Sequence, residues 1–513
     1  MAKEIQLDAN GKRKFGMLDK LAYAAGDLGC NMSFGLKGTV QTFWLAYMAL
    51  ETGLLSILLL AVQIWDAVND PLIGSLIDAD RRQYKMGKFK TYIFIGACGL
   101  IVGGAAVFLP FPDAPVVLKA ILFIIGYIIW DAAYTTANVP YGSMLSLVTE
   151  DSGERAQLSS WRSIGSGIGN ILPGIILPML IWHKVTTDDG VPVYNPETGV
   201  QEQILLGDRV FWAALLMGVI GFACFLFMIK KITIRVDENS VKTTDTPAKF
   251  NVISAFGNFM KNRPAVGATV AAMGMFMGMQ SATTASTIMF ATYFGMAELS
   301  GLIQMVGFLP AFAFIPFIKK IVDKFGKKEA SVAGTLVSLA GGFIMLLFPL
   351  FPNKTVSLVF FMLGLVIFGL GMGVYTCVSW ALMADAIDYN EWKTGKREEG
   401  TVYSLHSFFR KLAQGIGPSV VLVLMGALGY ISDLGPGGQD AATAYNMCWL
   451  VAGLYFFSAI MMFVGLTFIY NLDKKTMATM QAELDARHAA DAETAEEESF
   501  DGMKVVEEAS TEA

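Results

Sequence analysis

The chain has 513 residues, of which 54% are hydrophobic and only 16% are charged. About a quarter of the residues in a typical soluble protein are charged, so a chain this long and this poor in charge is predicted to be an integral membrane protein. The net charge of −6 does not indicate a basic partner, because residues 483–513 alone carry eleven acidic and two basic side chains. We expect a multi-pass protein of the inner or plasma membrane, monomeric, in contact with lipid and without a nucleic-acid partner.

Apolar runs of about twenty residues recur along the chain, which is the length of helix that crosses the hydrocarbon core of a bilayer. They predict an all-α polytopic membrane protein with twelve transmembrane helices. The runs lie near residues 20–47, 54–77, 91–111, 116–141, 158–182, 209–229, 265–294, 299–318, 330–351, 356–384, 401–430 and 444–470.

Lysine and arginine gather in alternate connecting segments. Five lie before or at the start of the first predicted helix (Lys20 is its first residue), five lie between the second and third, seven between the sixth and seventh, and five between the eighth and ninth. Because basic residues accumulate on the cytoplasmic side, this pattern predicts that both termini are cytoplasmic.

A weak internal repeat divides the chain into two halves. The segments DADRRQYKMGKFK (78–90) and KKIVDKFGKK (319–328) follow the second and the eighth predicted helices, at equivalent places in two six-helix units. We predict a cytoplasmic amino terminus, two six-helix bundles, a cytoplasmic linker between them, and an acidic cytoplasmic tail that is disordered or loosely helical. The amino terminus covers residues 1–19, the two bundles cover 20–230 and 264–472, the linker covers 231–263, and the tail covers 473–513.

Two acidic residues interrupt the second apolar run. Asp66 and Asp70 are four residues apart, so in a helix they share one face with the neighbouring Asn69. An acid at the bilayer centre costs about 2.5 to 3.5 kcal/mol on insertion scales, and such residues typically mark ion pathways. The alternative is that one aspartate pairs with Arg162 or Lys411 of a neighbouring helix.

Three motifs then point to a known family. The segments IWDAVNDPLIG (64–74) followed by GKFK, YIIWDAAYTTANVPYGSM (127–144) and ADAIDYNEWKTGKREEG (384–400) occur in this order. Together they resemble the glycoside-pentoside-hexuronide:cation symporters, the melibiose-permease branch of the major facilitator superfamily. The resemblance runs from about residue 20 to about residue 472.

This resemblance implies uptake of a sugar or glycoside driven by Na⁺ or H⁺, with two bundles rocking around a central site. It implies no cofactor beyond the coupling ion. The family's cation site matches Asp66, Asn69, Asp70 and Thr135 here. The chemistry agrees, because paired carboxylates with an amide oxygen suit a hard cation and close carboxylates can share a proton.

The sugar site departs from the family pattern. The two aspartates that hold the sugar in melibiose permease are matched by Asn31 and Asn138, which can still hydrogen-bond to hydroxyls. The tryptophan that follows is replaced by Gly142, so stacking on the sugar falls to Tyr134, Trp130 or Trp380. The candidate substrate residues are Asn31, Tyr134, Asn138, Arg162, Trp380, His406, Ser407 and Lys411.

The charge of the substrate stays open in the sequence. With two carboxylates removed, an anionic sugar such as a glucuronide could pair with Arg162 or Lys411. Equally, Asp27 or Asp131 could neutralise one of these cations and leave a site for a neutral pentoside or oligosaccharide.

Acidic and basic residues at the predicted cytoplasmic helix ends could close an inner gate by pairing across the two bundles. Exposed pairs are worth only about 0 to 1 kcal/mol each, which suits contacts that break in each cycle. The candidates are Arg155, Asp385, Asp388 and Arg397. The alternative is simple solvation of helix ends.

Other classes of membrane protein fit the sequence less well. The chain has three histidines, no HExxH motif and no paired cysteines, which argues against a membrane enzyme, and it lacks the GxxxxGK[ST] loop of a primary pump. A transporter of a non-sugar amphiphile on the same fold and a non-transporting membrane sensor remain as alternatives.

Overall fold

The computed structural model describes residues 12–80, 82–149, 151–236, 252–314, 317–395, 399–487 and 489. The described chain is almost wholly helical. The first group of helices is α1 (Met17–Phe34), α2 (Lys37–Ala46), α3 (Thr52–Ala79), α4 (Lys88–Val107), α5 (Val116–Val148), α6 (Ser152–Ile181) and α7 (Gly207–Lys231). The second group is α8 (Val252–Lys261), α9 (Arg263–Met289), α10 (Ser300–Phe308), α11 (Ile318–Phe325), α12 (Lys327–Leu347), α13 (Lys354–Thr394), α14 (Glu399–Ala427) and α15 (Ala441–Val464).

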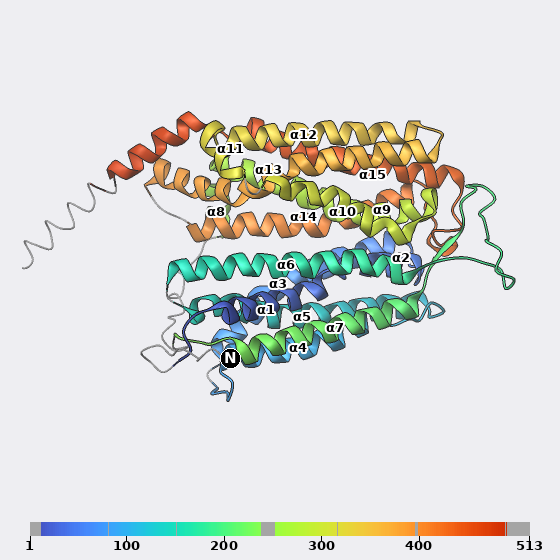
Figure 1. Cartoon of the computed structure of the whole chain (residues 1–513), viewed down its shortest axis with the longest axis horizontal. Helices are drawn as coiled ribbons and strands as arrows, with labels where there is room; N and C mark the ends of the chain where they lie inside the picture. Colours follow the sequence, from blue (N-terminus) through green and yellow to red (C-terminus); the bar gives the residue numbers. More distant parts are fainter. Residues whose placement is uncertain are drawn as a thin grey trace, which may run out of the picture.

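The two groups form two layers of roughly parallel helices, which we call the N-bundle (α1–α7) and the C-bundle (α8–α15) (Figure 1). Between α6 and α7 the chain forms a small antiparallel sheet of β1 (Trp182–Lys184) and β2 (Gln203–Leu205), with Trp182 opposite Leu205. We call this side of the molecule the hairpin end. The first described residues and the helix at 474–487 both lie at the opposite end (Figure 1).

Ten helices within the described residues are long and apolar enough to cross a membrane. Two of the twelve predicted spans are interrupted. The first, 20–47, consists of α1 and α2 with a turn at Gly35, where a Cβ would lie 3.2 Å from Pro173 of α6. The eighth, 299–318, consists of α10, a 3₁₀ turn at Leu309–Phe314 and the start of α11. The count of twelve spans therefore stays a prediction.

Local chemistry fixes several helix ends. The side chains of Asp151, Asn262, Asn353 and Asp440 accept hydrogen bonds from backbone N–H groups in the first turns of α6, α9, α13 and α15. Such caps satisfy donors that a helix start otherwise leaves free. Short turns of 3₁₀ or π helix extend or follow other helices, at Phe290–Phe294, Ala297–Leu299, Phe348–Leu350, Ser432–Leu434 and Gly465–Ile469.

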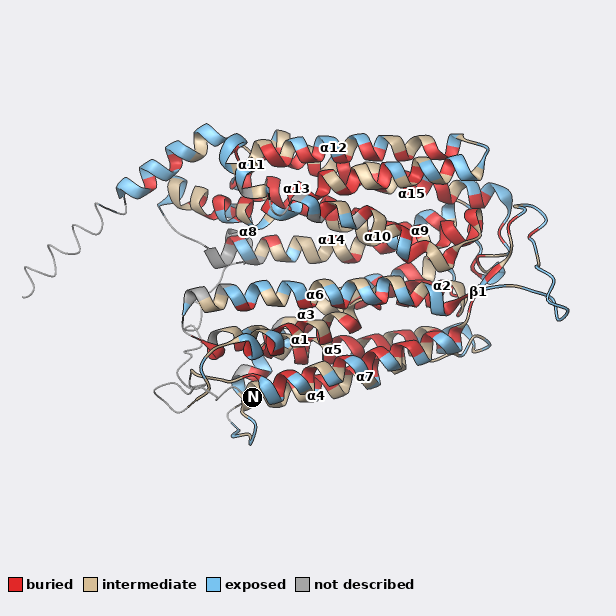
Figure 2. Cartoon of the chain, in the orientation of Figure 1, coloured by how far each residue is buried: buried red, intermediate tan, exposed pale blue. Residues whose placement is uncertain are grey.

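Small residues let the helices within each bundle approach closely, and the buried residues gather on these inner faces (Figure 2). A Cβ on Gly165 of α6 would collide with the carbonyl of Ala24 on α1, and a Cβ on Gly369 of α13 with that of Gly307 on α10. Gly167, by contrast, has open space around its missing side chain, so only some of the glycines of α6 allow close helix approach.

The segments outside the two bundles are partly described. The predicted linker 231–263 contains α8, a helix that the sequence did not predict, whereas its residues 237–251 lie outside the described residues. Residues 474–487, at the start of the predicted tail, are helical, and Glu483 there accepts a hydrogen bond of 2.6 Å from Trp392 Nε1 at the end of α13. The predicted boundaries of the two halves stay predictions.

Candidate functional site

The two bundles touch at the hairpin end through polar contacts. Asn195, in the loop between β1 and β2, donates to the carbonyl oxygens of Gly437 (2.7 Å) and Gln439 (2.9 Å) in the C-bundle. On helices, Thr284 of α9 donates to Gln41 Oε1 of α2 at 2.6 Å. These contacts hold the hairpin end closed.

The predicted cation residues meet between α3 and α5. Asn69 Nδ2 donates to Asp131 Oδ2 (3.1 Å) and lies 3.0 Å from Thr135 Oγ1, and the Thr135 hydroxyl donates to Asp70 Oδ1 at 2.9 Å. Asn69 and Thr135 are each 1% exposed. The structure thus brings Asn69, Asp70 and Thr135 into one hydrogen-bonded cluster and adds Asp131, which the sequence analysis had considered only as a partner for a cation of the sugar site.

Two lysines face the acids of this cluster. Lys37 Nζ of α2 lies 3.7 Å from Asp66 Oδ2, and Lys411 of α14 forms an ion pair with Asp70 across the two bundles. Three carboxylates, those of Asp66, Asp70 and Asp131, therefore face two ammonium groups. With all five groups ionised, the cluster keeps one negative charge to offer to a bound cation.

One oxygen of the cluster has no hydrogen-bond partner. Asn69 Oδ1 is buried and unpaired in the structure, although a buried amide oxygen is ordinarily satisfied. An amide oxygen beside carboxylates and a hydroxyl is the donor set that a hard cation such as Na⁺ accepts. The residues present therefore fit a monovalent cation. The sequence left open the alternative that one aspartate pairs with Lys411, and Asp70 does so. The cation site and this ion pair therefore involve the same residues.

The candidate sugar residues of the N-bundle lie on α1, α5 and α6. Asn31 Nδ2 donates to the backbone oxygen of Asp27 (2.8 Å), and Asn170 Nδ2 donates to Asn31 Oδ1 (2.8 Å). Asn138 Oδ1 accepts from the thiol of Cys30 at 3.8 Å. The two asparagines that replace the family's aspartates thus share one region, and Asn170 joins them without having been predicted.

Arg162 is already paired. Its Nε donates to Asp27 Oδ1 at 3.1 Å, and its guanidinium carbon lies 5.1 Å from the centroid of the Tyr141 ring. Tyr134, predicted to stack on the sugar, packs against the Phe34 ring with centroids 5.8 Å apart. Asp27, rather than a bound ligand, therefore neutralises Arg162 in this conformation.

The C-bundle brings Trp380 and His406 together. Their ring centroids are 6.0 Å apart, and His406 Nδ1 lies 2.9 Å from Thr269 Oγ1 of α9. Trp380 is 50% exposed and stacks on Tyr403, whereas His406 is buried. Ser407 is half-buried on the same helix, one turn before Lys411.

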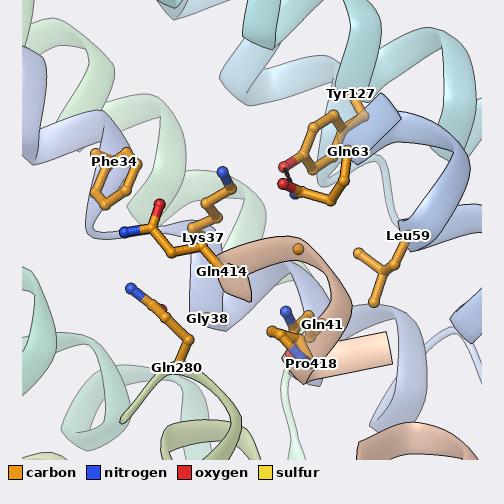
Figure 3. Close-up of a pocket in the computed structure, with 11 residues that line it drawn as sticks. Phe34, Lys37, Gly38, Gln41, Leu59, Gln63, Tyr127, Gln280, Gln414 and Pro418 are labelled. Carbon is orange, nitrogen blue, oxygen red and sulfur yellow. Dashed lines mark hydrogen bonds between the residues drawn. The ribbon is translucent and has the colours of Figure 1, made fainter. Parts of the chain in front are cut away.

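A small pocket lies where the bundles meet, and most of its polar lining was not predicted. Figure 3 shows Lys37, Gln41 and Gln63 from the N-bundle facing Gln280 and Gln414 from the C-bundle. The remaining lining residues are Phe34, Gly38, Leu59, Tyr127, Gly415 and Pro418. The signal was available, because a glutamine within an apolar span is itself an unusual and functionally suggestive residue.

The predicted inner gate is not seen as a set of cross-bundle pairs among the described residues. Lys327 of α12 donates to Asp385 of α13 at 2.6 Å within the C-bundle, and Arg155 Nε donates to Thr149 O at 2.9 Å within the N-bundle. Asp388 makes contacts of its own, and Arg397 lies outside the described residues. The inner gate stays a prediction, namely that these residues pair across the bundles when the cytoplasmic end closes.

Two helical bundles around a central polar site form the major facilitator fold, which solved structures share. The D-xylose-proton symporter aligns with a TM-score of 0.56 at 17% identity, over 86% of this chain and 95% of that one. The nucleoside transporter NupG aligns with a TM-score of 0.56 at 13% identity, over 88% and 100%.

Sequence comparison then gives the family. The profile of the family described as MFS/sugar transport protein matches residues 22–474, and the chain belongs to this family. It is 27% identical to the uncharacterized symporter YnaJ of Bacillus subtilis, over 93% of this chain and 96% of that protein. It is 27% identical to the glucuronide carrier protein homolog of Escherichia coli (80% and 84%) and 25% identical to the isoprimeverose transporter of Lactiplantibacillus pentosus (92% and 92%).

The resemblance seen in the motifs is therefore confirmed. The chain is a multi-pass protein of the cell membrane, in a family of transporters rather than enzymes.

Proposed function

We propose that the protein is a cation-coupled symporter that carries a sugar or glycoside into the cell by alternating access. The observation that carries this proposal is the cluster of Asp66, Asn69, Asp70 and Thr135 with Asp131. Against Lys37 and Lys411 it keeps one negative charge, and its Asn69 amide oxygen is buried without a partner. The names of relatives, a glucuronide carrier and an isoprimeverose transporter, support a sugar as the cargo. The coupling ion is Na⁺ or H⁺.

The conformation supports a state open to the cytoplasm. The hairpin end, which is the outer side under the predicted topology, is held closed, while the side chains of Asp70 and Lys411 remain 36% and 38% exposed near the middle of their helices. Solvent therefore reaches the centre from the other end. In this account the cation first orders α3 and α5, and the N-bundle asparagines then bind the sugar.

Coupling follows if each ligand favours the state that the other binds best. Thr135 contacts the cation cluster, and Tyr134 and Asn138 lie beside it on α5, so one helix carries residues of both sites. A shared helix can transmit a reciprocal coupling free energy of about 1 to 3 kcal/mol, or roughly 5- to 150-fold in affinity.

The function is tested by uptake of labelled glycosides in proteoliposomes, with a panel of uronides, pentosides and galactosides, each with and without Na⁺ at fixed pH. Accumulation that depends on an ion gradient supports symport. If no glycoside of the panel shows ion-dependent uptake or exchange, symport is refuted. The alternatives are then a transporter of a non-sugar amphiphile and a membrane sensor.

The sugar site predicts a selective loss of sugar affinity. We expect Asn138→Leu, which keeps the approximate volume but removes both hydrogen-bonding groups, to raise the KM for the sugar about 5- to 150-fold, because the cost of lost hydrogen bonds is about 1 to 3 kcal/mol. Cation binding, measured as the rise in thermal stability when Na⁺ or protons are added, should change little. The exposed Asn258→Leu on α8 is the matched control. An unchanged KM would remove Asn138 from the site.

A further inference from the structure

The basic side chains of the central region differ in whether an aspartate lies against them. Lys37, Arg162 and Lys411 each lie against an aspartate, namely Asp66, Asp27 and Asp70, respectively. Arg410, on α14 one residue before Lys411, has no carboxylate partner among the described residues. Its Nε is buried without a hydrogen-bond partner.

Aromatic rings surround this guanidinium instead of acids. The Arg410 guanidinium carbon lies 5.2 Å from the ring centroid of Phe276 on α9 and 5.4 Å from that of Trp380 on α13. Cation–π contacts at this range are favourable, but they supply no hydrogen-bond acceptor for the guanidinium.

Among the described residues, the helices that pack against this part of α14 offer no spare acid. Helix α9 carries none in its sequence, Asp385 of α13 is taken by Lys327, and Asp388 and Glu391 of α13 have interactions of their own. On α3, Asp66 and Asp70 face the two lysines. The remaining titratable neighbours on α14 itself are Tyr403, which stacks on Trp380, and His406, whose ring meets that of Trp380 edge-on.

An unpaired guanidinium inside a membrane protein is expensive and typically marks a substrate pathway. Arginine also presents a planar fork of donors that matches a carboxylate through two parallel hydrogen bonds. Beside it, the half-exposed Trp380 ring offers an apolar face on which a sugar ring can stack. The two features together match a sugar that carries a carboxylate.

We propose that Arg410 is the anion subsite of the transporter and that the substrate is an acidic sugar, whose ring packs on Trp380 and whose carboxylate binds the guanidinium. This inference rests on the proposed sugar transport. It also completes the charge balance of the site, because the cation cluster of the N-bundle has one negative charge to spare and Arg410 has one positive charge. A monovalent cation and a monoanionic sugar satisfy both.

The test measures binding to the purified full-length protein with two pairs of probes that differ only at C6. These are methyl β-D-glucuronide against methyl β-D-glucoside, and methyl β-D-galacturonide against methyl β-D-galactoside. We expect the wild-type protein to bind the acid of at least one pair about tenfold more tightly or better, as charge-assisted hydrogen bonds are the stronger ones. Arg410→Gln should remove this preference while changing the affinity for the neutral partner less than about twofold, on the same reasoning.

Two further variants test whether the preference for the acidic sugar depends on the guanidinium group of Arg410 in particular. Arg410→Lys keeps the charge without the fork and should retain part of the preference, whereas Arg209→Gln, an exposed arginine at the start of α7, should retain all of it. The ratio within a pair is insensitive to partial misfolding, because misfolded molecules reduce the number of binding sites equally for both probes. Acetate serves as a free anion and should compete only weakly.

The proposal is overturned if Arg410→Gln keeps the wild-type ratio, if the wild-type protein prefers the neutral sugars, if neither member of either pair binds, or if acetate competes as well as the uronide. The symporter function is judged separately. If one of these results is found but a neutral glycoside is still taken up in an ion-driven way, the symporter function stands and only the anion subsite is refuted.

Discussion

Replacing Asp70 by asparagine should abolish cation-driven accumulation of substrate. Asp70 accepts from Thr135 and pairs with Lys411, so the change removes a candidate ligand and leaves the ammonium group without its acid. Interactions with charged groups contribute about 1.5 to 3 kcal/mol, which corresponds to a loss of roughly 10- to 150-fold in cation affinity. The measurement is the concentration ratio of labelled glycoside across proteoliposomes that carry an imposed Na⁺ or H⁺ gradient.

The same assay should show a similar loss for Asp66→Asn, which leaves Lys37 without its acidic neighbour. Asp113→Asn, at an exposed position between α4 and α5, is the matched control and should accumulate substrate normally. Exchange of sugar without a gradient can survive in the Asp70 variant, because the asparagines of the sugar site are untouched. Accumulation against a gradient in the double variant of Asp66 and Asp70 would refute the cation assignment.

Replacing Gly301 by valine should trap the carrier with its hairpin end open. Gly301 is the second residue of α10, and a Cβ there would collide with the carbonyl oxygen of Gly174 on α6, across the two bundles. The closed contact seen in the structure cannot form with a larger side chain, so every cycle that passes through this state is blocked. We expect net uptake to fall to background while the folded protein remains in the membrane.

The matched control is Gly174→Ala at the same contact. A Cβ on Gly174 meets no atom within 4 Å, so this variant should transport at close to the wild-type rate. Distances between spin labels at the hairpin ends of α6 and α10 should lengthen for Gly301→Val and stay unchanged for Gly174→Ala. Wild-type uptake by Gly301→Val would show that the contact is not part of the transport cycle.

Much of this fold is readable from the sequence because bilayer helices need long apolar runs. The ten uninterrupted spans follow those runs closely. The interruptions were not predictable in the same way, since the turn at Gly35 lies inside an apolar run and depends on the approach of Pro173 from α6. Helix α8 lay within a polar linker and gave no spanning signal.

The site was predictable where spacing within one helix determines it. The i, i+4 relation of Asp66 and Asp70 and the position of Thr135 in a recognisable motif singled out residues that the structure places close together, and their role as cation ligands stays a proposal. Pairings between helices could not be read from spacing. The sequence offered Asp27 or Asp131 as a partner for Arg162 or Lys411 without choosing between them, and the structure pairs Asp27 with Arg162. The pairing of Lys37 with Asp66 and the isolation of Arg410 depend on how α2, α3 and α14 are placed in space.

The most direct test of the account is counterflow and uptake of a labelled glycoside in proteoliposomes containing the purified protein, with Na⁺ and proton gradients imposed separately. A cation-coupled symporter should accumulate the glycoside with at least one of the two gradients, and should lose this accumulation when that gradient is collapsed or when Asp70 is replaced by asparagine. Uptake that merely equilibrates and is indifferent to both ions, or to Asp70, would contradict it.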